Sequence, residues 1–350
     1  MAKTRLMPAY ETRMGRAYEG DARNVLPTIP DESINLVFTS PPFALRRQKA
    51  YGNVDANEYI DWFWPIAEQI HRILRPDGSF VMELGGAWNK GSGTRSLFIY
   101  ELLIRLGKLF HLAQDFYWHN PSRLPTPAEW VTIRRTRVKE AVTHIWWLSK
   151  STEPQADNRR VLAPYSKSMK RLLKDGYKPA MRPSQHEIGP NFQRDNGGAI
   201  PPNILTVPNT RSHDDYIFRC KAAGLPVHPA RFPPELPDFF IRFLTSPDDT
   251  VLDPFSGSAS TLVVSKKLGR ECLGFDLSPD YVERGTARLV QTQVGDKLDG
   301  AAEPTMSAPT TAAGKRVADK LADPNYKKPS FKKQTRRANK DQNTPLLKGD

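Results

Sequence analysis

The chain has 350 residues, of which 39% are hydrophobic and 10% aromatic, so it holds enough apolar material for a sizeable buried core. Its formal charge of +13 favours an anionic partner, because Lys and Arg gain free energy by releasing counterions from a phosphate backbone. Two cysteines, Cys220 and Cys272, exclude a disulfide framework, and no Cys/His cluster has the spacing of a zinc site.

The first residues, "MAKTRLMPAY", contain no apolar signal-peptide region. No stretch of the sequence approaches the roughly 18 consecutive apolar residues that a membrane span requires. We therefore expect a cytoplasmic protein that uses no membrane and no metal.

The first part of the chain alternates short apolar runs with helical patterns. We predict buried strands at 34–39, 79–84 and 142–149, and helices at 57–78 and 96–107, the second ending at Gly107. Strands that alternate with helices indicate a mostly parallel sheet with helices on both faces.

Residues 151–225 interrupt this pattern. They are rich in Pro, Gly, Asn, Arg and Lys, and they contain no long periodic stretch, so we predict a loop-rich insertion. The α/β pattern then returns, with helices at 239–244, 260–269 and 278–290 and strands at 250–255 and 271–276. Ser278 and Pro279 stand at the N-cap and first position of the last helix.

The final segment has a different composition. Residues 301–350 contain 11 Lys or Arg against 5 Asp or Glu, and apolar residues thin out after about residue 295. This composition predicts a basic, disordered tail, which either is merely solvated or attaches weakly to nucleic acid.

The segment "VLDPFSGSAST" (251–261) is a strand followed by a tight loop of small residues and a helix start. In a doubly wound sheet such a turn lets a ligand approach the backbone and the helix N-terminus. Asp276 ends the next strand, where it can accept hydrogen bonds from ribose hydroxyls. The loop is neither G-x-G-x-x-G nor a P-loop, and Asp253 suits a cationic cofactor group such as the amino group of S-adenosylmethionine. Taken alone, it is also compatible with an ordinary turn.

The segment "VFTSPPFAL" (37–45) places a serine and two prolines directly after a buried strand. An exocyclic amine of a base is a poor nucleophile, and accepting its N–H hydrogens favours a tetrahedral nitrogen. Ser40 Oγ and the Pro41 carbonyl are two such acceptors, since Pro41 and Pro42 bring no N–H. Phe43 offers a face for stacking an extruded base. A simple strand-terminating loop is the alternative interpretation.

The segments "DESINLVF", "TSPPF" and "LDPFSGSAST" together resemble the cytosine-N4-specific DNA methyltransferases of type II restriction-modification systems. The catalytic half precedes the cofactor-binding half, as in the permuted β group, and the resemblance covers roughly residues 16–290. It implies a Rossmann-like, circularly permuted S-adenosylmethionine-dependent methyltransferase sheet with a target-recognition insertion. The implied organisation is a catalytic half at 16–150, a target-recognition region at 151–225, a cofactor-binding half at 226–295 and the tail at 296–350.

The resemblance assigns roles to individual residues. The catalytic motif S-P-P-[YF] corresponds to Ser40, Pro41, Pro42 and Phe43. The cofactor-binding residues it implies are Asp21, Phe232, Asp253, Phe255, Gly257, Ser258 and Asp276. Of these, Asp21 also fits a simple helix N-cap. The family places the loop "PSRLPTPAEW" (121–130), after Trp118 and Asn120, beside the base pocket. Packing in the core or loop is the alternative for Trp118 and Trp130.

The expected partner is double-stranded DNA with a specific site, and methylation would protect this site from a cognate restriction endonuclease. We expect the protein to be a monomer.

Cytosine C5 methylation needs an attacking thiolate, and neither cysteine follows a proline in a catalytic loop. Adenine-N6 methylation is the main alternative, because related enzymes use the same fold with a D-P-P-Y loop, and Ser40 favours cytosine N4. A catalytically inactive DNA-binding protein is the third interpretation. In the favoured one, the amine is methylated by direct displacement and its proton leaves to solvent.

Overall fold

A computed structural model describes residues 7–44, 54–176, 194–209, 215–222, 224 and 231–298. Almost all of the predicted tail, and parts of the predicted insertion, lie outside the described residues.

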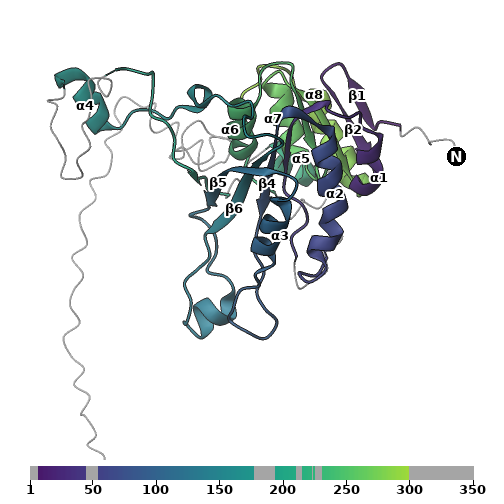
Figure 1. Ribbon diagram of the computed structural model, residues 1–350, viewed down its shortest axis with the longest axis horizontal. Helices are drawn as coiled ribbons and strands as arrows, with labels where there is room; N and C mark the ends of the chain where they lie inside the picture. The colour runs from purple at the N-terminus through teal and green to yellow at the C-terminus, as the bar shows by residue number, and fades with distance from the viewer. Residues whose placement is uncertain are drawn as a thin grey trace, which may run out of the picture. The chain divides into compact units, whose positions relative to one another are not determined.

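The described residues form one mixed sheet of nine strands (Figure 1). Its order is β1 (Tyr10–Thr12), β2 (Gly15–Glu19), β9 (Glu271–Asp276), β8 (Thr250–Asp253), β3 (Ile34–Thr39), β4 (Leu74–Leu84), β6 (Val142–Ser149), β5 (His111–His119) and β7 (Ile204–Thr206). Strands β2, β9, β8, β3 and β4 are mutually parallel, and β6 runs antiparallel to β4 and β5. The predicted parallel sheet is confirmed, and its permutation is visible, because β8 and β9 insert between strands from the N-terminal part.

Helices cover both faces of this sheet (Figure 1). One face carries α1 (Ala22–Val25), α2 (Tyr59–Ile73) and α3 (Phe98–Leu106), and the other α6 (Glu235–Leu244), α7 (Ser260–Lys267) and α8 (Pro279–Gln291). The alternation of β3 sets the two sides, since successive strand side chains point to opposite faces. Val37 packs with buried residues of α2 and α3, whereas Leu36 and Phe38 pack with those of α6.

Several boundaries differ from the sequence prediction. Helix α2 ends at Ile73, and β4 begins at once, so the predicted Pro-Asp-Gly turn lies within β4. The pairing of β3 with β4 shifts there, between Ile34 opposite Leu74 and Leu36 opposite Ser79. Four strands that lie toward the sheet edges, β1, β2, β5 and β7, were not predicted.

The insertion contains structured parts. Helix α4 (Lys167–Asp175) buries none of its residues, β7 pairs with β5, and α5 (Asp215–Ala222) follows. An antiparallel bridge joins Ala163 to Ala199 and closes the segment that carries α4. The two ends of that segment are therefore tied together, and β7 is part of the main sheet.

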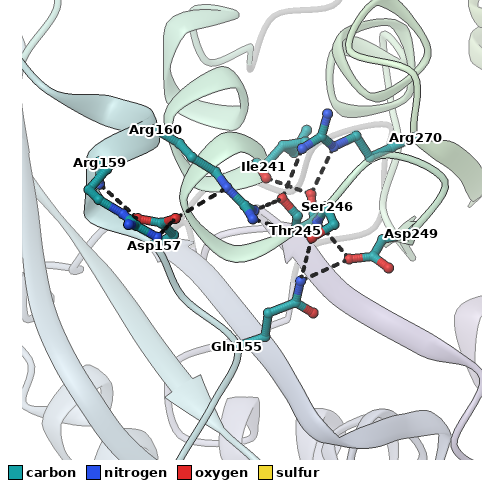
Figure 2. A network of polar contacts seen from close by, with 9 residues as sticks. All are labelled: Gln155, Asp157, Arg159, Arg160, Ile241, Thr245, Ser246, Asp249 and Arg270. Carbon is teal, nitrogen blue, oxygen red and sulfur yellow. Dashed lines mark hydrogen bonds and ion pairs between the residues drawn. The ribbon is translucent and has the colours of Figure 1, made fainter.

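A polar network fixes the start of the insertion to the end of α6 (Figure 2). The Thr245 carbonyl accepts hydrogen bonds from Arg160 Nη1 at 2.6 Å and from Arg270 Nη2 at 2.8 Å. Arg270 Nε also donates to Thr245 Oγ1 at 3.0 Å, and Gln155 donates to Ser246 Oγ at 2.9 Å. These contacts lie just before β8, at the end of the sheet where the parallel strands begin.

We predict that Arg270→Met lowers the free energy of unfolding by about 1–3 kcal/mol, because Thr245 loses a buried, charged hydrogen-bond partner. The matched control is Arg242→Met, which removes only a half-exposed pair with Asp238 and should change stability by about 0.5 kcal/mol or less. Urea unfolding of both variants measures the difference, and equal losses would contradict the role of the network.

Candidate active site

A cavity of about 680 Å³ lies at the carboxyl ends of the parallel strands. In open α/β sheets this is where ligands bind, because the loops that follow neighbouring strands meet there. Residues that follow β2, β3, β8 and β9 line it. Residues near the ends of β4 and β5, and near the start of the antiparallel strand β6, complete the lining. The cavity therefore brings together segments from both ends of the described chain.

Ser40 follows the last residue of β3 and faces a carboxyl group on β4. Its Oγ donates a hydrogen bond to Glu83 Oε2 at 2.6 Å. The parallel register explains this pairing, because Thr39 lies opposite Met82, and Ser40 and Glu83 are the residues that follow them. Glu83 was not among the predicted site residues. The available signal was a carboxylate inside the apolar run "FVMEL".

Glu83 is an unusual carboxyl group. Burial raises its pKa to about 7, although the hydrogen bond from Ser40 and the positive charge of Arg123 lower it. Its side chain is only 3% exposed, yet it belongs to the cavity lining. A carboxyl group with such a pKa can exchange a proton near neutral pH.

The S-P-P-F loop is held close to β4. Pro41, Pro42 and Phe43 all line the cavity. A Cβ atom added at Gly85 would lie 2.5 Å from a ring atom of Phe43, so only glycine allows this approach. The loop is therefore packed against the end of the neighbouring strand.

Asp253 is the only predicted site residue that does not line the cavity. Its side chain is 1% exposed, and both of its oxygens accept hydrogen bonds within the protein. Thr39 Oγ1 donates to one oxygen at 2.6 Å, and Thr261 Oγ1 donates to the other at 2.7 Å. Burial raises the pKa of Asp253 to about 6. In this structure Asp253 connects β3 to α7 and lies behind the lining.

The loop after β8 approaches β9 closely. Gly257 has a positive φ of 47°, which suits glycine, and its N–H donates to Asp276 Oδ2 at 2.9 Å. The N–H of Ser278 donates to the other oxygen of Asp276 at 2.9 Å. Both Asp276 and Gly257 line the cavity together with Phe255 and Ser258. Burial raises the pKa of Asp276, and the two backbone hydrogen bonds lower it.

Asp21 is both a helix N-cap and a residue of the cavity lining. It is the N-cap of α1, where its carboxylate accepts the N–H of Arg23 at 2.8 Å, and it also lines the cavity. The guanidinium of Arg23 lowers the pKa of this carboxyl group. Trp62, which helical periodicity alone could not distinguish from core, lines the same region and packs 5.9 Å from the ring of Phe255.

The remaining predicted residues close the other side of the cavity. Phe232 packs edge-on against Phe38, with ring centroids 5.4 Å apart, and is part of the lining. Trp118 and Asn120, at the end of β5, line it as well, and Arg123 joins them from the loop that follows. The loop expected beside the base pocket thus contributes to the cavity. Sequence analysis did not single out Arg123.

The described residues contain neither a candidate metal site nor a candidate membrane span. No group of three or more His, Cys, Asp or Glu side chains there could hold a metal ion. No helix within these ranges is long and apolar enough to cross a bilayer.

Comparison with known sequences defines the family. The profile of a family described as DNA methylase, covering N6 and N4 methylases, matches residues 34–287. This match includes the S-P-P-F loop, Glu83 and the loop after β8. The chain therefore belongs to this DNA methylase family.

Individual relatives support the same assignment. The type II methyltransferase M.PvuII of Proteus hauseri is 48% identical over 83% of this chain and 88% of its own length. The solved PvuII DNA methyltransferase, described as cytosine-N4-specific, superposes with a TM-score of 0.67 at 39% identity, over 90% of this chain and 94% of that one. A putative DNA modification methylase from Thermus thermophilus, solved with S-adenosyl-L-methionine, has a TM-score of 0.51 at 22% identity, over 83% of this chain and all of that one. This last structure supports the fold alone.

We predict that Thr39 and Asp253 are energetically coupled. Asp253→Ala should destabilise the protein by about 2 kcal/mol, since it leaves the buried hydroxyls of Thr39 and Thr261 without their acceptor. Thr39→Val removes one of these hydroxyls, so the double variant should lose at least about 1 kcal/mol less than the sum of the single losses. Urea unfolding of the three variants measures the coupling, and additive losses would refute it.

Proposed function

We propose that this chain is a site-specific DNA methyltransferase that transfers a methyl group from S-adenosylmethionine to N4 of a cytosine flipped out of duplex DNA. One observation carries the proposal: Ser40, bonded to the buried Glu83, lies in the same cavity as Gly257 and Asp276. The similarity to M.PvuII, and to the PvuII structure described as cytosine-N4-specific, supports this choice of base and atom.

The residues around the loop after β8 fit S-adenosylmethionine. Asp276 presents a carboxylate suited to ribose hydroxyls, and the positive φ of Gly257 lets a ligand approach the backbone there. Trp62 and Phe255 provide flat apolar surface for an adenine ring, with Asp21 nearby in the lining. When bound, this cofactor supplies an electrophilic methyl group. The residues of the chain then have to position and deprotonate the amine.

The hydrogen bond to Glu83 determines how Ser40 meets the substrate. A serine hydroxyl has one hydrogen, and Ser40 donates it to Glu83 Oε2. Its Oγ therefore faces the cavity as an acceptor only. The Pro41 carbonyl is the second acceptor proposed for the two N–H hydrogens of the amine. This pairing favours a tetrahedral nitrogen whose lone pair is aimed at the methyl group.

Glu83 also provides a destination for a proton. After the new N–C bond forms, the amine nitrogen must lose one hydrogen. We propose that Ser40 Oγ accepts this proton while its own hydrogen passes to Glu83 Oε2, in place of direct release to solvent. A carboxyl group with a pKa of about 7 can accept the proton and return it to water before the next turnover.

DNA is the proposed macromolecular partner, and residues 151–225 are the proposed target-recognition region. Helix α4 in this region has no buried residue and contains Lys167, Lys170, Arg171 and Lys174, which suits contact with phosphates. We propose that the enzyme acts as a cytoplasmic monomer and protects its site from a cognate restriction endonuclease.

The test is incubation of the full chain with methyl-labelled S-adenosylmethionine and DNA, followed by nucleoside analysis. We expect labelled N4-methylcytosine from the native protein. Ser40→Ala should reduce turnover about 100-fold or more, because it removes an acceptor of the reacting amine, with cofactor affinity nearly unchanged. Labelled N6-methyladenine would select the alternative base. Absence of any labelled nucleoside would support a DNA-binding protein without activity.

The pKa of Glu83 predicts a pH dependence. Because burial raises this pKa to about 7, Glu83 becomes protonated as the pH falls through 7. A protonated Glu83 can no longer take up the proton that Ser40 would transfer to it. The single-turnover rate constant should then fall about tenfold per pH unit below 7 and level off above it. The Glu83→Gln variant should have a low single-turnover rate constant at every pH, without the decrease below pH 7. A native profile that is flat across neutral pH would exclude the proton-accepting role.

A further inference from the structure

We propose that Arg123 selects the target base: its guanidinium holds N3 and O2 of the flipped cytosine while Ser40 accepts from the amino group at the other end of that edge. The inference rests on the proposed function, because it requires a cytosine in the cavity. It assigns a specificity-determining role to a residue outside the S-P-P-F motif.

Arg123 is anchored in the wall of the cavity. It lines the cavity together with Ser40 and Glu83, and its Nη1 donates to Thr143 Oγ1 at 3.2 Å. Thr143 lies on β6 and is only 3% exposed, so this anchor does not move freely. The positive charge of Arg123 also lowers the pKa of Glu83, as expected for a cation near that carboxyl group.

Within the described ranges, hydrogen bonds use only a small part of the donor capacity of Arg123. A guanidinium has five N–H donors, and the bond to Thr143 is the only side-chain hydrogen bond of Arg123 among the described residues. No carboxylate of the described residues lies within ion-pair distance of the Arg123 guanidinium. A half-buried cation with free donors beside a cavity is suited to acceptors on a ligand.

The loop that carries Arg123 is held in place by polar contacts. Asn120 Oδ1 accepts the N–H of Ser122 at 3.1 Å and that of Asn209 at 3.2 Å. The N–H of Arg123 donates to the Asn120 carbonyl at 3.2 Å, and Lys139 Nζ donates to the Pro121 carbonyl at 3.1 Å. The guanidinium is therefore preorganised, which reduces the entropy lost on binding.

The order of the strands puts these groups in a row. Strands β8, β3, β4 and β6 are successive neighbours. Along their edge lie the cofactor loop after β8, Ser40 after β3, Glu83 near the end of β4, and Thr143 near the start of β6, with Arg123 bonded to it. A base whose amino group lies at Ser40, next to the cofactor loop, can thus direct its remaining polar edge toward Arg123.

The donor and acceptor pattern of this row matches cytosine. The Watson–Crick edge of cytosine has an amino group followed by two adjacent acceptors, N3 and O2. Arginine reads such a pair with two parallel N–H bonds, as it reads O6 and N7 of guanine. The same edge of adenine has its amino group, then N1, then a C–H. One of the two guanidinium N–H donors would therefore lose its acceptor. An unpaired donor in a buried site is a strong basis for rejection.

The experiment replaces one acceptor of the base. We would first map N4-methylcytosine in DNA treated with the full chain, then make a duplex with that site and a second with 3-deazacytosine at the target, where N3 becomes C–H. The native enzyme should methylate the analogue about 10- to 100-fold more slowly, as for the loss of one bidentate base contact. Arg123→Met should be slower on cytosine by a similar factor and show little further loss on the analogue.

Two control variants separate this role from others. Arg123→Lys keeps the positive charge near Glu83 without the planar fork, so it should resemble Arg123→Met in its cytosine-to-analogue ratio. Lys108→Met removes an exposed cation beyond the end of α3 and should keep the native ratio. The ratio is insensitive to general damage, and thermal unfolding with cofactor titration checks folding.

The outcomes are distinguishable. If the native enzyme forms N4-methylcytosine and Arg123→Met still loses 10- to 100-fold on the analogue, Arg123 does not contact N3 and the inference fails alone. The inference also fails, with the proposed function intact, if Arg123→Lys has the native ratio of rates on cytosine and on the analogue. A positive charge without the planar guanidinium would then be enough for recognition of N3. If the native enzyme forms no N4-methylcytosine, the proposed function fails and this inference fails with it.

Discussion

The carboxyl group of Asp253 accepts hydrogen bonds from two buried hydroxyls, those of Thr39 and Thr261, and the remaining site geometry depends on this arrangement. Thr39 precedes Ser40, and Thr261 lies in the first turn of α7, just after the cofactor loop. The contact between Thr39 and Asp253 joins positions 214 residues apart in the chain. A carboxyl group buried this deeply is costly unless it is hydrogen-bonded, so its partners are held in one geometry. The catalytic loop and the cofactor loop thereby share a common anchor.

A second buried carboxyl group, that of Glu83, performs a different task. Asp253 has protein partners for both oxygens and lies behind the lining, whereas Glu83 faces the cavity and accepts a hydrogen bond from Ser40. Burial raises the pKa of both groups, but only Glu83 can exchange a proton with a ligand in the cavity. One carboxyl group thus supports the structure, and the other supports the proposed chemistry. The two strands on either side of β3, namely β8 and β4, provide these positions.

Local patterns were sufficient for much of the fold. Strands β3, β8 and β9 are short apolar runs followed by turn residues, and these signals lie within a few residues of each other. The strands toward the sheet edges were missed because they are short or because polar residues interrupt their apolar ones, as in "HLAQDFYWH" of β5. Pairing with a neighbour decides their conformation. The end of α2 was placed too late, since the Pro-Asp-Gly turn is absorbed into β4.

The sequence by itself determined the residues of the two loops, because Ser40–Phe43 and Asp253–Ser258 are contiguous motifs whose chemistry follows from residue type and order. Only the tertiary structure decided which other groups these loops meet. Glu83 reaches Ser40 through the register of β3 with β4, and Arg123 enters the cavity because β6 lies beside β4. The structure also shows that the carboxyl group of Asp253 is buried and accepts hydrogen bonds from Thr39 and Thr261. Sheet order and register arise from contacts between distant segments, and such contacts leave little trace in the local sequence pattern.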